Sequence, residues 1–160
     1  VKQKLGSVPN LFRLMSNSPA TLEGYLGLSG ALGGGKLSPA TREGLALVLA
    51  NVNGCTYCNS AHGYIAKNLV KVSDAEIDAN RNAASHDPKI DAALKLARTI
   101  AKKHGQVDLA ELEAARAAGY TDAELVEIVA HVALNVLTNY INEVFKTEVD
   151  FPVSEIKRAA

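Results

Sequence analysis

The chain has no excess of charge of either sign. Its 160 residues include 17 Lys and Arg and 17 Asp and Glu, so the formal net charge is zero. Proteins that bind nucleic acid use an excess of basic side chains to neutralise phosphates, and many peripheral membrane proteins carry polybasic segments. The balanced composition therefore gives no reason to expect nucleic acid or a membrane surface as a partner.

Long apolar runs are also missing. No uninterrupted stretch reaches the roughly 20 residues that a helix needs to span a bilayer, and residues 1–5 are not followed by the apolar core of a signal peptide. We therefore expect an intracellular, cytoplasmic protein. The length suits one domain with a substantial core, and no linker divides the chain, so we predict a single domain over residues 1–160.

Alternating patterns typical of β-strands are absent, whereas start and end signals of helices recur. Ser18, Ser38 and Asp87 each precede a proline, which suits an N-cap followed by the first helical residue. The tetrapeptides at 73–76 (SDAE) and 121–124 (TDAE) fit capping boxes. We predict an all-α bundle of seven or eight helices. The expected helices cover residues 19–32, 39–52, 56–70, a short segment from 74, 88–104, 109–119 and 122–146.

The chain has only two cysteines, Cys55 and Cys58. A secreted disulfide scaffold would use more, spread along the sequence. A bridge that closes so short a loop removes little entropy from the unfolded chain, so its value for stability is low. Two cysteines in a C-x-x-C arrangement, in a chain that has no others, therefore indicate chemistry.

His62 lies four residues after Cys58, so the two share one face of the expected 56–70 helix. A thiol at a helix N-terminus feels the positive end of the dipole, and a nearby imidazole accepts its proton. Both effects favour the thiolate and lower the thiol pKa from about 8.5 to about 3.5–7.5. The first turn of this helix is therefore a candidate redox site.

Two other interpretations of the cysteines are open at this stage. They could be buried, inert side chains that behave as small hydrophobes. They could instead bind zinc together with His62, with Glu43 or His131 as a fourth ligand, although no second C-x-x-C or H-x-x-x-H pair occurs. A thioredoxin-like site would need a βαβ context, which this helical sequence does not offer.

Glu43 lies twelve residues before Cys55, in the first turns of the expected 39–52 helix. It could be an exposed acid that complements the helix dipole. Alternatively, it could orient His62 and raise its basicity, as the third member of a nucleophile–base–orienter set.

The chain contains the pattern E-x11-C-x-x-C-x-x-x-H, which is formed by Glu43, Cys55, Cys58 and His62. This pattern resembles the signature of the alkylhydroperoxidase-D-like proteins. These belong to the carboxymuconolactone decarboxylase-like superfamily. Residues 8–12 (VPNLF), 18–19 and 139–152 also resemble the peroxidase-related members. The resemblance implies an all-helical fold, a homo-oligomer that is a trimer or a hexamer, and reduction of a hydroperoxide substrate through the cysteine pair.

By the same resemblance, Cys58 would be the peroxidatic cysteine and Cys55 the resolving one, with His62 and Glu43 as a proton relay. The implied activity is antioxidant and needs no organic cofactor and no metal, only an external thiol or protein reductant. Tyr57 stands where the best-studied type has a second histidine, which makes Tyr57 a secondary candidate. Members without the cysteines act on lactones, and both thiols here argue against that branch.

Within the expected 122–146 helix, the stretch from Leu125 to Leu137 is apolar except for polar residues spaced four apart, and two more polar residues follow at the same spacing. This stripe could be a set of satisfied core residues, or it could bring His131, a second secondary candidate, near the thiols. Because the rest of the helix is apolar almost all round, we expect part of it to be buried between subunits. The polar residues are Glu127, His131, Asn135, Asn139 and Glu143.

Two further functions are compatible with these residues. The protein could be a thiol-disulfide oxidoreductase or redox sensor with little peroxidase activity. It could also be a non-catalytic helical assembly module whose cysteine pair binds metal.

Overall fold

Residues 8–154, which the computed structural model describes, form eight α-helices and one π-helical turn, and no strand occurs within that range. The all-α prediction is therefore confirmed. The elements are α2 (Asn10–Met15), α3 (Pro19–Gly33), α4 (Pro39–Asn53), α5 (Thr56–Ile65), η1 (Ala66–Val70), α6 (Asp74–Arg81), α7 (Pro88–Lys102), α8 (Leu109–Ala117) and α9 (Asp122–Phe145).

Most helices begin where the capping signals predict. Ser18, Ser38 and Asp87 each accept a hydrogen bond from a backbone N–H in the first turn of α3, α4 and α7, and a proline follows each of them. Thr121 and Glu124 form both arms of the capping box at the start of α9. These local signals stabilise helix ends without help from distant residues.

Three features differ from the sequence prediction. The helix α2 was not expected, and the predicted 56–70 helix changes from α to π geometry at Ala66. The capping box at Ser73 is incomplete: Ser73 Oγ accepts from Glu76 N at 3.2 Å, but the Glu76 carboxylate accepts hydrogen bonds from Ser85 and His86 instead. A tertiary contact has thus replaced the second arm of the box.

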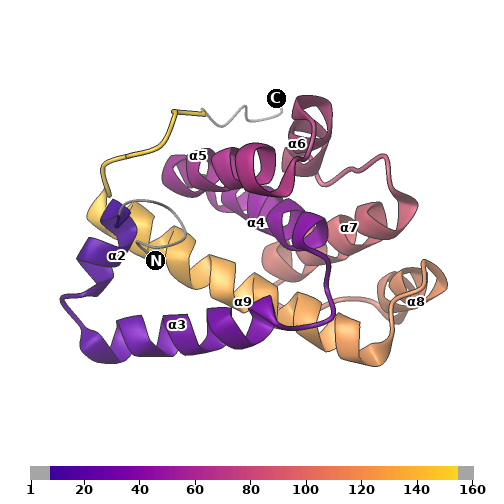
Figure 1. The fold of residues 1–160 in the computed structure, drawn as a ribbon. Helices are drawn as coiled ribbons and strands as arrows, with labels where there is room; N and C mark the ends of the chain where they lie inside the picture. Colours follow the sequence, from indigo (N-terminus) through magenta and orange to yellow (C-terminus); the bar gives the residue numbers. More distant parts are fainter. Residues whose placement is uncertain (1–7, 155–160) are drawn as a thin grey trace.

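Helix α4 lies at the centre of the molecule, between α5 and α6 on one side and α9 on the other, with α7 alongside (Figure 1). Its residues from Leu45 to Ala50 are all buried. The core is built mainly from α4, α7 and α9, with Leu45, Leu94 and Ile128 fully enclosed. Burial of each such side chain contributes about 1.5–3 kcal/mol relative to exposure. The central helix is therefore a fixed platform for the residues it carries.

Helix α9 has an unusual distribution of side chains. Its inward face carries polar residues that are buried against α3, α4 and α5, whereas its outward face is apolar and exposed. By length and composition α9 could cross a membrane, but it packs on five other helices, α2, α3, α4, α5 and α7, as a core helix does. The outward side chains are Val126, Val129, Ala133, Leu137, Tyr140 and Val144.

The triple-glycine loop between α3 and α4 is held by a carboxylate of α9. Glu127 accepts hydrogen bonds from the backbone N–H groups of Lys36, at 2.8 and 3.0 Å, and of Leu37, at 3.2 Å. A Cβ atom added at Gly35 would lie 2.6 Å from Glu127 Oε2. Glycine is therefore needed at Gly35 so that the loop can approach the carboxylate.

We predict that Gly35→Ala destabilises the protein by about 1–2 kcal/mol, because the displaced Glu127 carboxylate loses charge-assisted hydrogen bonds to the loop. Gly34→Ala is the matched control, since its new Cβ would meet only a carbonyl oxygen at 3.6 Å, an ordinary contact. Urea unfolding of the three proteins measures the difference. Equal free energies of unfolding for the two variants would contradict this account of the loop.

Candidate active site

The thiol pair is positioned by a tight turn between α4 and α5. Gly54 adopts a left-handed conformation, with φ 73°, and ends α4. The backbone N–H of Cys55 then donates to Ala50 O at 2.9 Å. Cys55 is the N-cap of α5, and its Sγ accepts a hydrogen bond from Cys58 N at 3.2 Å. The C-x-x-C motif therefore forms the first turn of a helix, as the sequence predicts.

Glu43 and His62 face each other from α4 and α5. The distance between Glu43 Oε2 and His62 Nδ1 is 2.8 Å, and both side chains are mostly buried. Burial lowers the pKa of His62, but the charge and hydrogen bond of Glu43 and the charge of Cys58 outweigh this effect, so that the pKa is raised. The Glu43 carboxylate thus fixes the imidazole and favours its protonated form.

Cys58 is 2% exposed and Cys55 is fully buried. The hydrogen bond from the Cys55 thiol is the largest influence on Cys58, and it lowers the thiol pKa. Burial acts in the opposite direction, while the charge of His62 and the amides of Asn142 and Asn139 lower the pKa further, to about 6. The same hydrogen bond raises the pKa of Cys55. The hydrogen bond between the two sulfurs therefore favours a thiolate at Cys58 and a neutral thiol at Cys55.

The amide of Asn142 donates to Cys58 Sγ at 3.2 Å. Neither this residue nor the role of Asn139 was identified from the sequence. Asn139 was noticed only as part of the polar stripe, and Asn142 lies three residues later on the same inward face of α9. The asparagines in a largely apolar helix were a sequence signal for a polar site. Only the packing of α9 against α5 shows that two of them lower the pKa of the Cys58 thiol.

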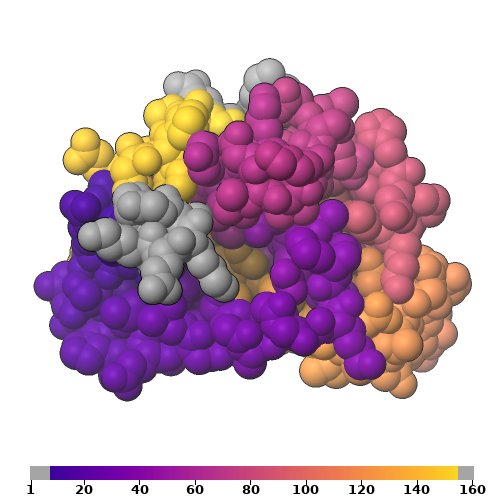
Figure 2. Space-filling view, in the orientation of Figure 1, coloured from indigo at the N-terminus to yellow at the C-terminus, as the bar shows by residue number. Residues whose placement is uncertain are grey.

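A pocket of about 260 Å³ opens beside the Glu43–His62 pair. It lies where α3, α4, α5 and α9 meet, and the molecular surface is hollowed between α3 and α5 with α9 visible at the bottom (Figure 2). Neither cysteine is among its lining residues, so a molecule in the pocket meets His62 first. The lining residues are Tyr25, Ser29, Gly33, Arg42, Glu43, Ala46, His62, His131, Leu134, Asn135 and Thr138.

Tyr25 links this pocket to the thiol. Burial raises the pKa of Tyr25 against a hydrogen bond with Ser29 that lowers it, and the charges of Cys58 and Glu43 add to the rise. Cys58 is therefore close enough to act electrostatically on a residue that lines the pocket. Cys58 itself does not line the pocket.

His131 was a secondary candidate, and the structure brings it into the same pocket. Its side chain is 5% exposed, and Nε2 has no hydrogen-bond partner among the described residues. Burial lowers its pKa, and the nearby Arg42 lowers it further. His131 is therefore a neutral imidazole at neutral pH, in contrast to His62, whose pKa is raised.

Tyr57 has a different environment from the other candidates. Its hydroxyl donates to Asp150 Oδ1 at 2.8 Å and accepts from Leu11 N at 3.2 Å. Its ring packs edge-on against Phe151, with centroids 5.9 Å apart. Asp150 also accepts from Asn10 N at 2.8 Å. Tyr57 thus ties the start of α2 to the segment after α9, and its hydroxyl is engaged away from the pocket.

The possible metal ligands do not gather at one point. Within residues 8–154, no three side chains of His, Cys, Asp or Glu converge in an arrangement that could hold a metal ion. In particular, Glu43 is bound to His62 on the pocket side, whereas Cys55 is buried at the start of α5. The described geometry is that of a thiol pair with an adjacent acid–imidazole pair.

The chain is similar to known proteins in sequence and in fold. Residues 19–99 match the sequence pattern of the carboxymuconolactone decarboxylase family. No curated protein sequence matches the chain. A solved structure of an alkylhydroperoxidase AhpD core, an uncharacterized peroxidase-related protein from Ralstonia eutropha JMP134, is 27% identical with a TM-score of 0.85, and the match covers 93% of this chain and 80% of that chain.

Two further structures share the fold at lower identity. One is an uncharacterized peroxidase-related protein from Silicibacter sp. TM1040, which is 22% identical with a TM-score of 0.81 over 96% of this chain and 80% of that chain. The other is the debrominase Bmp8 in complex with 2,3,4-tribromopyrrole, which is 21% identical with a TM-score of 0.79 over 93% and 81%. The chain therefore has an alkylhydroperoxidase-D-like fold.

We predict that alkylation of Cys58 by iodoacetamide is half-maximal near pH 6, because the thiolate is the reactive form and the pKa of this thiol is lowered to about 6. Asn142→Leu should move the midpoint upward, since the amide that donates to the sulfur is lost. Asn68→Leu, at an exposed amide on η1, is the control and should leave the midpoint unchanged. Mass spectrometry identifies the modified cysteine. A wild-type midpoint near pH ~8.5, the ordinary value, would exclude an activated thiol.

Proposed function

Since the chain belongs to the carboxymuconolactone decarboxylase family, and since its cysteines adjoin an acid–imidazole pair, we propose that it is a thiol-dependent hydroperoxide reductase. The observation that carries the proposal is the placement of the two thiols in the first turn of α5, where Cys58 N donates to Cys55 Sγ, on the helix whose His62 is held by Glu43 at 2.8 Å. The lowered pKa of Cys58 agrees with this arrangement. The nearby pocket of about 260 Å³ suits a small substrate.

In the first step, the Cys58 thiolate attacks the distal oxygen of the hydroperoxide. The S–O bond forms as the O–O bond breaks, so the sulfur is oxidised to a sulfenic acid and the substrate is reduced to an alkoxide. His62 lines the pocket and is held in its protonated form by Glu43. It donates a proton to the alkoxide, which leaves as an alcohol.

In the second step, the Cys55 thiol attacks the Cys58 sulfenic acid. A disulfide forms, and the hydroxyl leaves as water with the proton of Cys55. Cys55 already hydrogen-bonds to Cys58 at the start of α5, so little movement is required. Two electrons and two protons from an external thiol reductant then restore both thiols. No organic cofactor or metal takes part in this cycle.

The burial of both sulfurs favours a small hydroperoxide over a protein disulfide as the oxidant of Cys58, and by the same argument it favours a small thiol over a protein as the reductant. An exchange partner would have to bring its own sulfur into line with Cys58, which is 2% exposed. A small hydroperoxide has no such difficulty. We place the protein in the cytoplasm, where thiols are kept reduced, and the activity would be antioxidant.

We also propose that the chain assembles with copies of itself through the outward face of α9. Six apolar residues, spaced three or four apart, form an exposed stripe along the whole helix. A stripe of this spacing is typical of a helix that packs against another helix, and large exposed apolar patches mark interaction sites. The resemblance to alkylhydroperoxidase-D-like proteins favours a trimer or a hexamer.

The experiment that tests the function is peroxide consumption, measured with hydrogen peroxide and cumene hydroperoxide and with dithiothreitol as reductant. We expect Cys58→Ser to abolish it. Cys55→Ser should react once and stop as a sulfenic acid, because no thiol remains to condense with it, and dimedone should trap that product. The reverse pattern, with Cys55 as the attacking thiol, would overturn the assignment of roles.

Glu43→Gln tests the relay in the same assay. It keeps the size of the side chain but removes the charge that favours protonated His62. General acid–base catalysis contributes typically about 10²–10⁴-fold, so we expect a loss of this order, together with an unchanged unfolding midpoint. Glu23→Gln, on the exposed surface of α3, is the control. Wild-type turnover of Glu43→Gln would remove Glu43 from the reaction.

We predict that Leu137→Glu dissociates the assembly, because a charge in the middle of the α9 stripe cannot be buried against a second helix. Light scattering should give a multiple of the 16.9 kDa chain mass for the wild type and the single-chain mass for the variant. Leu109→Glu replaces an equally apolar, exposed residue outside the stripe and should stay assembled. A wild type that is monomeric at micromolar concentration would refute this interface.

A further inference from the structure

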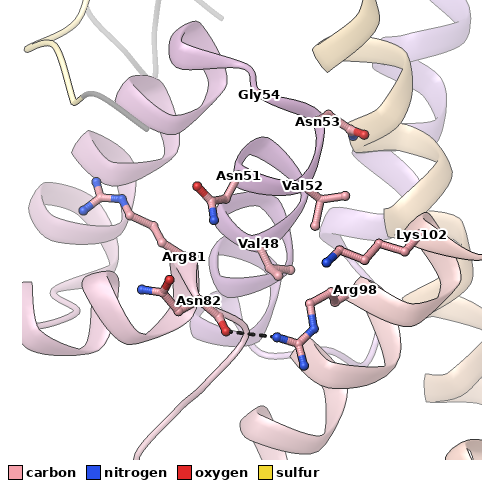
Figure 3. A pocket seen from close by; sticks show the side chains of 9 residues that line it. All are labelled: Val48, Asn51, Val52, Asn53, Gly54, Arg81, Asn82, Arg98 and Lys102. Carbon is pink, nitrogen blue, oxygen red and sulfur yellow. Dashed lines mark hydrogen bonds between the residues drawn. The ribbon is translucent and has the colours of Figure 1, made fainter. Parts of the chain in front are cut away.

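A second pocket, of about 390 Å³, lies on a different part of the molecule from the one beside His62. It is formed where α4 and α6 end, against the last turns of α7 (Figure 3). None of its nine lining residues is acidic, and three of them are basic. They are Val48, Asn51, Val52, Asn53, Gly54, Arg81, Asn82, Arg98 and Lys102.

Arg98 and Lys102 bring two positive charges to the same side of α7. They are four residues apart and therefore neighbours on the helix surface, where like charges destabilise a helix. Lys102 forms no ion pair within the described part of the chain. Arg98 makes a long hydrogen bond, 3.4 Å, to Asn82 O, and its charge also acts on the Asp91 carboxylate, whose pKa it helps to lower. Both side chains extend towards the pocket (Figure 3). Their charges are thus largely available to a ligand.

Arg81 has a different role in the same wall. Its guanidinium turns away from the pocket (Figure 3) and binds Asn59 Oδ1 and Ser154 Oγ, each at 2.8 Å, as well as the Asp78 carboxylate. Arg81 therefore contributes little donor capacity to the pocket. The charges that matter there are those of Arg98 and Lys102.

Asn51 supplies a neutral donor opposite these charges. Its side-chain amide projects into the pocket from α4 (Figure 3) and makes no hydrogen bond to another residue within 8–154. The helix dipole explains why cations lie near the ends of α4 and α7, but it does not explain an unpartnered amide aimed at the same space. Two cations and an amide that converge on a concave surface are the donors that an oxyanion needs.

We propose that this pocket binds a small oxyanion, the phosphoryl or carboxylate group of a metabolite, through Arg98, Lys102 and Asn51. The guanidinium provides paired N–H donors that match such a group, and the ammonium provides a further charge. The binding does not depend on the peroxidase activity, because it involves none of the residues of the proposed reaction.

The pocket nevertheless adjoins the thiol turn. Gly54 lines it and precedes Cys55 directly. Asn53, also in its wall, donates from Nδ2 to Asn139 Oδ1 at 2.8 Å, and Asn139 in turn acts on Cys58. A single hydrogen bond therefore connects Asn53, in the wall of the pocket, to Asn139, which favours the thiolate form of Cys58.

Thermal unfolding in the presence of inorganic phosphate or succinate tests the proposal, at ionic strength held constant with sodium chloride. A ligand that binds only the folded state raises the melting temperature, and we expect a rise of about 2–4 °C in the millimolar range. Lys102→Gln and Arg98→Gln should each weaken binding about tenfold, as loss of one charge-assisted hydrogen bond predicts. Lys95→Gln, on the same helix with its side chain paired to Asp91, is the control and should bind normally.

The two anions separate the ligand classes. A rise with phosphate alone assigns a phosphoryl group, a rise with succinate alone assigns a carboxylate, and a rise with both assigns a general oxyanion site. The absence of a rise with either anion in the wild type would overturn the proposal. Equal rises in the wild type, Lys102→Gln and Arg98→Gln would also overturn it, because binding would then be elsewhere.

Discussion

The candidate site depends on the left-handed turn at Gly54. For a residue with a side chain, this left-handed conformation costs about 1–2 kcal/mol of free energy, whereas glycine adopts it without that cost. The turn allows α5 to begin directly after α4 and to pack along it. Glu43, near the start of α4, is thereby brought to His62, in the second half of α5.

The elements that the sequence predicts best are those set by local contacts. The starts of α3, α4, α7 and α9 follow from capping side chains within the same turn. The C-x-x-C pair and His62 share a turn of α5, so their proximity also follows from helix geometry. The Glu43–His62 pair joins two helices, and it was expected only because the spacing resembles a known signature.

The features that the sequence did not predict depend on tertiary contacts. Helix α2 has no side-chain cap, and it is held by Asp150 and Tyr57 from distant parts of the chain. Glu76 leaves the expected capping box because Ser85 and His86 offer it better-placed donors. Asn142 reaches Cys58 across 84 positions of sequence. No local pattern encodes which inward-facing side chain of α9 meets the sulfur.

Helix α9 links the candidate site to the proposed assembly interface. Most amphipathic helices turn apolar residues inward and polar residues outward. The first half of α9 follows this rule with Leu125 and Ile128, whereas the part from His131 to Asn142 buries mainly polar side chains. Its inward asparagines and His131 provide the hydrogen bonds and the polar pocket wall that a thiolate and its substrate need. That polar face leaves the helix with less apolar surface to bury within its own chain.

The outward face of α9 then supplies the apolar surface that the inward face lacks. Buried polar groups contribute to stability only when their partners are well placed, and Asn142 Oδ1 and His131 Nε2 have no partner within residues 8–154. Packing of Leu137 and Tyr140 against another copy would fix the helix that carries these groups. Association would therefore help to hold the inward amides of α9 at hydrogen-bonding distance from Cys58. The position of these donors would then depend on contacts with another copy as well as on contacts within the chain.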